Sequence, residues 1–154
     1  ICVPGAPPLL KTSLDLECVR VAAAANCSTD IVISTDAGRY LCEYIFYKSL
    51  HAVQEQCADG KCPLAAGPAA LFVHIPPKIG EPCSMEALVG TLSTVVKCCL
   101  QQLQERSNTV KELAEIMGAE SRRAAMLLRE CDFNLEAALQ VFCDSQEREQ
   151  QLLA

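Results

Sequence analysis

The 154-residue chain is 51% hydrophobic and 21% charged, which is enough apolar sequence for a packed core and excludes a disordered segment. Its 13 basic and 19 acidic residues give a net charge of −6, which argues against a nucleic-acid partner because phosphate contacts need a basic surface. No apolar run approaches the roughly 18 residues of a membrane span, and the start of the chain lacks the basic segment of a signal peptide. We therefore expect a globular protein without a membrane partner. Because the first residue is Ile1 rather than Met, we also expect a fragment of a longer chain.

Cysteine is frequent in this chain, with 11 residues, and the number is odd. Cys98, Cys99 and Cys143 lie inside apolar stretches, where a thiol behaves as a small hydrophobic group. With no secretory signal in view, this usage favours free thiols in a reducing compartment, and we expect a cytoplasmic protein. Zinc sites usually contain two closely spaced cysteine pairs, and the spacing of Cys57 and Cys62 does not match them. We therefore expect no metal and no cofactor.

The first two thirds of the chain alternate between helical and strand-like patterns. The expected elements are, in chain order, a Pro-rich loop over 1–11, a helix from Thr12 to about Ala25, a strand over 31–34, a helix from about Tyr40, a strand over 70–75 and a helix from Ser84 to about Leu103. Both strands are short apolar runs, and aromatic side chains at the start of the second helix are expected in the core. The alternation predicts an α/β domain over 1–106, with helices packed on a parallel sheet.

The pattern changes after Arg106, where acidic residues outnumber basic ones and the apolar spacing shortens. Three short helices are expected there, capped in turn by Thr109 (in a capping box), Ser121 and Asn134, and ending near Met117, Cys131 and Phe142. They predict a small three-helix bundle over 109–145, joined to the α/β domain through Ser107–Asn108. Residues 146–154 are polar and are expected to fray.

Cys42 differs from the other cysteines because it lies in the first turn of an expected helix, directly after a strand and a glycine turn. Free backbone N–H groups and the helix dipole at such a position stabilise a thiolate or an oxyanion. Of the two histidines, His51 lies nine residues further along the same helix, about 13 Å by helical rise, and cannot reach Cys42. His74 lies near the end of the second expected strand, at the sheet edge where α/β proteins bind ligands. The sequence thus predicts a Cys42–His74 pair within hydrogen-bond reach, or one rotamer change from it, as nucleophilic acyl transfer requires.

Other interpretations of these two residues remain open. A cysteine early in a helix is more often inert, and a histidine in an apolar strand is more often part of the core. The chain could then be a non-catalytic adaptor built on a degenerate scaffold, or a thiol-redox or metal-binding protein. Retention of both Cys42 and His74 argues against the adaptor.

Two segments carry a family resemblance. Ser34–Leu50 (STDAGRYLCEYIFYKSL) resembles the nucleophile segment of type I pyroglutamyl peptidases, and Phe72–Pro77 (FVHIPP) resembles their histidine segment. The resemblance covers about 1–105, the C-terminal half of that family. It implies part of a three-layer α/β/α sheet and a cytosolic cysteine peptidase that releases N-terminal pyroglutamate from peptides, with Cys42 and His74 as catalytic residues. It also implies a third catalytic residue, a glutamate, in a missing N-terminal half that supplies most of the substrate-binding residues.

The C-terminal region resembles a ubiquitin-associated (UBA) domain. The residues that carry this resemblance are Leu113, Met117-Gly118, Ala124-Ala125, Leu128, Asn134 and Ala137-Ala138-Leu139. The resemblance implies ubiquitin as a partner of 109–145, bound through Met117, Gly118 and Leu139. Ala119 stands where an aromatic residue is usual in the family, so we expect weak binding at best.

Overall fold

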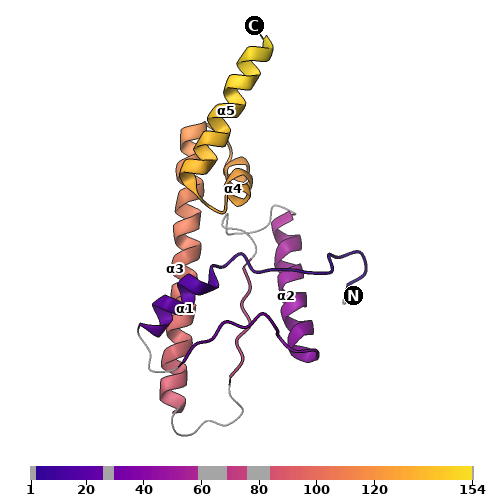
Figure 1. The fold of residues 1–154 in the computed structure, drawn as a ribbon, viewed down its shortest axis with the longest axis vertical. Coiled ribbons are helices and arrows are strands. Elements are labelled where there is room, and N and C mark those ends of the chain that lie inside the picture. Colours follow the sequence, from indigo (N-terminus) through magenta and orange to yellow (C-terminus); the bar gives the residue numbers. More distant parts are fainter. Residues whose placement is uncertain (1–2, 26–29, 59–68, 76–83, 154) are drawn as a thin grey trace.

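The computed structural model describes residues 3–25, 30–58, 69–75 and 84–153, and the statements below concern these residues. Over them the chain forms five helices: α1 (Leu16–Ala24), α2 (Leu41–Ala58), α3 (Met85–Met117), α4 (Ser121–Glu130) and α5 (Leu135–Leu153). Figure 1 shows α3 as the long axis of the molecule, with α1 crossing one half of it and α4 and α5 lying along the other half. Helix α2 stands to one side and contacts no other helix of the described chain.

The predicted α/β fold is wrong, because no two of the described segments pair as strands. The run at 31–34 and the run at 70–75 are both single segments without regular secondary structure. Ile31 and Leu71 are partly buried because they pack against the cluster that α1 forms with α3, whereas Val32, Ile33, Val73 and Ile75 are exposed. β-Branched residues favour a half-buried surface rather than a sheet as such, and here helices supply that surface. The three-layer arrangement and its sheet edge are therefore absent from the described residues.

Helix α1 begins three residues later than the sequence predicts. Asp15 is its N-cap, and the Asp15 carboxylate accepts a hydrogen bond from the backbone N–H of Cys18 at 3.0 Å. The Thr12 hydroxyl accepts instead from the N–H of Leu14, in the turn before the helix. α1 then buries Val19 and Ala23 against Val95 of α3.

Helix α3 begins as predicted, with the Ser84 hydroxyl accepting from the N–H of Ala87 at 3.1 Å. It does not end near Leu103 but continues to Met117, through the expected linker at 107–108, and is 33 residues long in all. Thr109 is therefore inside the helix, where its hydroxyl donates to the carbonyl of Glu105, and the predicted cap at this residue is wrong. The helix ends at Gly118, whose φ of 58° is the left-handed conformation that glycine adopts readily.

The end of α3 packs with α4 and α5 around one apolar cluster. Its buried members are Val110, Leu113, Ala114, Ala124, Ala125, Leu128 and Ala138. Asn134 caps α5 as predicted, accepting from the N–H of Ala137 at 3.0 Å, whereas α4 has Glu120 rather than Ser121 as its N-cap. Residues 146–153, which were expected to fray, continue α5. That 109–145 is a separate domain stays a prediction, because its first helix is the last part of α3.

None of the five described helices combines the length and the apolar character needed to cross a membrane.

Candidate functional site

Cys42 lies in the first turn of α2, as the sequence predicts, and a tight turn leads the chain into that helix. In this turn the N–H of Gly38 donates to the Asp36 carboxylate at 2.8 Å, and the N–H of Asp36 donates to the Ser34 hydroxyl at 3.1 Å. Gly38 has a φ of 84°, which side chains rarely tolerate, so a glycine is required here. The Cys42 thiol is half-buried at a helix end where backbone N–H groups have no intrahelical partner. A negatively charged sulfur or oxygen is stabilised at such a position.

His74 is connected to the same helix by a row of aromatic rings. The ring of Phe46, one turn after Cys42 on α2, lies 6.1 Å from the ring of Phe72. The Phe72 ring in turn meets His74 edge-on, with centroids 5.0 Å apart. Since residues four apart share a helix face, this row places the histidine segment along the side of α2 that carries Cys42. The predicted sheet edge does not exist, and direct hydrogen-bond contact between Cys42 and His74 stays a prediction.

The segment at 69–75 joins α2 to the other helices. Leu71 packs against the clusters of α1 and α3, whereas its neighbour Phe72 faces Phe46 of α2. Figure 1 shows the same segment running between α3 and α2. His74 itself is exposed to solvent, so it is accessible to a ligand.

His51 belongs to a different neighbourhood, as predicted from its position on α2. Its Nδ1 lies 3.3 Å from the Glu55 carboxylate, and its ring stacks on Tyr47 with centroids 6.3 Å apart. The Tyr47 hydroxyl donates to the carbonyl of Pro7, which ties the N-terminal segment to α2. This arrangement was not predicted, although the four-residue spacing of Tyr47, His51 and Glu55 is a visible signal for it.

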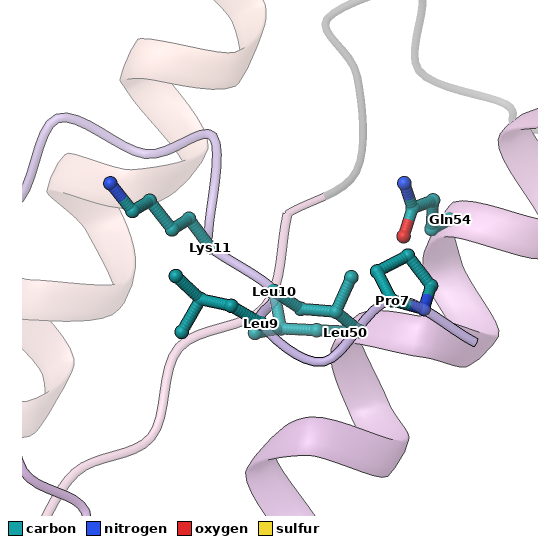
Figure 2. Close-up of a pocket in the computed structure, with 6 residues that line it drawn as sticks. All are labelled: Pro7, Leu9, Leu10, Lys11, Leu50 and Gln54. Atoms are coloured by element: carbon teal, nitrogen blue, oxygen red, sulfur yellow. The ribbon is translucent and has the colours of Figure 1, made fainter. Parts of the chain in front are cut away.

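A small pocket lies where the N-terminal segment crosses α2. It has a volume of about 200 Å³ and is lined by Pro7, Leu9, Leu10, Lys11, Leu50 and Gln54 (Figure 2). Leu50, a buried hydrophobic residue of α2, contributes to the apolar lining. The pocket includes neither Cys42 nor His74, so it is a feature separate from the predicted pair.

Cys18, Cys42, Cys98, Cys99, Cys131 and Cys143 carry free thiols, but their surroundings differ. Burial raises the pKa of the Cys99 thiol, and the neighbouring Cys98 adds to this effect, so Cys99 is a poor nucleophile. Across the described ranges no three His, Cys, Asp or Glu side chains gather as a metal site would require. The alternative zinc ligand Cys62 lies outside the described residues.

The residues proposed from the UBA resemblance lie at the edge of the C-terminal core and in the turn beside it. Met117 and Leu139 are half-buried and pack against the apolar cluster, and Gly118 forms the turn between α3 and α4. Ala119 follows this turn, with its N–H donating to the carbonyl of Ala114 at 3.0 Å. Ubiquitin binding through these residues stays a prediction.

Comparison with known proteins bears on the first resemblance. The human pyroglutamyl-peptidase 1-like protein is 33% identical over 118 residues, which are 75% of this chain and 49% of that protein. Human and rat pyroglutamyl-peptidase 1 are each 28% identical over 111 residues, or 71% of this chain and 46% of theirs. No family model and no solved structure matches. The chain spans about half the length of the curated relatives it matches, and its similarity to proteins named pyroglutamyl-peptidase 1 supports a peptidase family at moderate identity.

Proposed function

We propose that this chain carries the nucleophile and the acid–base residue of a cytoplasmic cysteine peptidase that releases N-terminal pyroglutamate from peptides. The observation that carries the proposal is the row of rings from Phe46 through Phe72 to His74, which ties the histidine to the helix of Cys42. The names of the curated relatives support the choice of substrate class.

In the proposed mechanism, the Cys42 thiolate attacks the carbonyl carbon of the pyroglutamyl residue. Backbone N–H groups in the first turn of α2 stabilise the negative oxygen that forms. His74, as imidazolium, gives its proton to the departing amine while the C–N bond breaks and a thioester remains. His74 then takes a proton from water, the resulting hydroxide attacks the thioester, and pyroglutamic acid leaves as the thiolate of Cys42 and the imidazolium of His74 are restored. A carboxylate that orients His74 would come from a segment outside these 154 residues.

The experiment is hydrolysis of a fluorogenic pyroglutamyl amide by the 154-residue chain and by a chain extended upstream in its gene. We expect turnover by the extended chain, its loss in Cys42→Ser and a large decrease in His74→Gln. His51→Gln is the matched control, since it changes the other histidine of α2 and leaves the proposed pair intact. Residues 1–154 alone should not turn over at a useful rate, because positioning contributes several kcal/mol to comparable reactions. Inactivity of the extended chain would overturn the peptidase proposal.

A second candidate function is a ubiquitin-binding adaptor that uses 109–145. It is favoured by apolar side chains that the C-terminal core leaves exposed, at Ile116, Met126 and Val141. Titration of the labelled full chain with ubiquitin should shift the amide signals of Met117, Gly118 and Leu139 only at high ubiquitin concentration. Ala119→Phe should strengthen binding if the turn is the contact. The absence of shifts at any surface would refute this candidate.

A further inference from the structure

Arg106 occupies an unusual place on α3, because it is a charged residue within an otherwise apolar row. Leu103, three residues before it, is buried with Leu14 in one cluster. Val110, four residues after it, is buried in the separate cluster of α3, α4 and α5. These spacings put the three side chains on one face of the helix. Arg106 therefore lies at the joint between the two cores.

The guanidinium of Arg106 contacts two segments that are far apart in the sequence. Its Nη1 donates a hydrogen bond to the carbonyl of Ser13, just before α1. The central carbon of the guanidinium, Cζ, also lies 4.6 Å from the ring centroid of Phe133, a residue in the loop between α4 and α5. One turn earlier, the side chain of Gln102 accepts a hydrogen bond from the N–H of Asp15 at 2.9 Å. Burial lowers the pKa of Arg106 and the Asp15 charge opposes that change, so the guanidinium stays charged within the joint.

The loop that holds Phe133 is strained. Asp132 and Phe133 have φ values of 50° and 60°, and consecutive side-chain-bearing residues rarely adopt this left-handed conformation. The N–H of Phe133 donates to the carbonyl of Leu128 at 2.7 Å, which keeps the loop closed over the end of α4. Strained backbone persists only where its surroundings hold it, and the cation beneath the Phe133 ring is part of those surroundings.

We propose that Arg106 is a positioning residue that couples the α4–α5 loop to the segment before α1. Movement of Phe133, for example when a partner binds the C-terminal helices, exposes one face of the guanidinium and loosens its hydrogen bond to Ser13. Among the described helices, α1 and α2 make no contact with α4 or α5. Helix α3 is in contact with α1, α4 and α5, and the Arg106 side chain on it meets both the segment before α1 and the α4–α5 loop.

Amide hydrogen exchange on the full chain tests this coupling. Phe133→Leu keeps an apolar side chain but removes the ring, and it should speed exchange about fivefold in residues 13–18 as well as in its own loop. Arg106→Gln should speed exchange in both segments, and the double variant should exchange no faster in residues 13–18 than Arg106→Gln alone. Arg122→Gln on α4 is the control, because Arg122 is exposed and outside the joint.

A substitution that acts on the segment before α1, rather than on the α4–α5 loop, provides a second readout if a Phe133 variant folds poorly. Gln102→Ala loosens Asp15 and should speed exchange at 132–134, but only while Arg106 is present. Arg106→Lys, which retains the charge without the planar group, should restore part of the protection. Faster exchange confined to 131–135 in Phe133→Leu, or additive effects in the double variant, would overturn the coupling.

Discussion

The C-terminal helices and α2 are packed in very different ways. At the junction of α3, α4 and α5, five apolar side chains have no exposed surface: Val110, Leu113, Ala124, Leu128 and Ala138. In α2, Leu50 is the buried hydrophobic residue, at 3% exposure, and the helix contacts other segments rather than other helices within the described chain. Leu41, Tyr44 and Ile45, beside Cys42, remain exposed. The candidate catalytic residue Cys42 thus lies on a helix with few buried side chains, whereas the C-terminal helices share a fully buried apolar core.

The largest expected effect comes from the C-terminal core. Leu128→Ala should lower the free energy of unfolding by about 3 kcal/mol, because the side chain is fully buried and leaves a cavity. Leu50→Ala should cost less, about 1–2 kcal/mol, since Leu50 already lines an open pocket and loses fewer contacts. Urea unfolding followed by circular dichroism measures both, with exposed Leu100→Ala as the control. Equal losses of unfolding free energy in Leu50→Ala and Leu128→Ala would contradict the difference in packing between α2 and the C-terminal helices.

A smaller effect is expected where α2 meets the histidine segment. Phe46→Leu removes the ring pair with Phe72 and should weaken this contact by about 1 kcal/mol. Hydrogen exchange at residues 71–74 should become faster, while exchange at the C-terminal helices stays unchanged. Tyr44→Leu is the matched control, since Tyr44 is exposed and has no such ring contact among the described residues. Unchanged exchange at 71–74 in Phe46→Leu would show that the rings do not hold the segment.

A substitution at Ser13 should raise the stability of the protein, whereas the substitutions above lower it. The buried hydroxyl oxygen of Ser13 has no hydrogen-bond partner among the described residues, so Ser13→Ala removes a polar atom that gains nothing from burial. Stability should rise by up to about 1 kcal/mol. Ser34→Ala is the contrasting variant, because the Ser34 hydroxyl makes two hydrogen bonds with Asp36. Both are measured as urea midpoints, and a loss of stability in Ser13→Ala would contradict the prediction.

The smallest effect concerns the pH dependence of thiol labelling. The raised pKa of Cys99 leaves less thiolate at a given pH, so iodoacetamide should label it about severalfold more slowly than exposed Cys18. The difference should narrow as the pH rises through the raised pKa of Cys99. The raised pKa of Cys99 also contributes to folding stability below the pKa of the unfolded thiol. This contribution is lost as the pH rises through the pKa of the thiol in the folded protein. Mass spectrometry of labelled peptides between pH 7 and about 10 measures the rates, and equal rates at all pH values would contradict the prediction.

Local signals in the sequence predicted several helix starts well. Ser84 and Asn134 cap their helices as predicted, and Cys42 lies in the first turn of α2. These features depend on hydrogen bonds between residues about three apart, so the local sequence contains the information for them. The capping-box pattern at Thr109 was misleading, because a continuous apolar row through Leu103, Val110 and Leu113 favours an unbroken helix.

The sequence by itself determined the caps at Ser84 and Asn134, the position of Cys42 and the apolar content that the core requires. The tertiary structure decided that the runs at 31–34 and 70–75 form no sheet and that Ile31 and Leu71 pack against helices instead, because either arrangement depends on residues distant in the sequence. It also decided the length of α3 and the exposure of Tyr40 and Tyr44, which were expected in the core. The contact of Phe46 with Phe72 and the joint at Arg106 each connect residues separated by more than twenty positions. Only the folded chain can specify such contacts, because no local pattern records which distant segment a side chain meets.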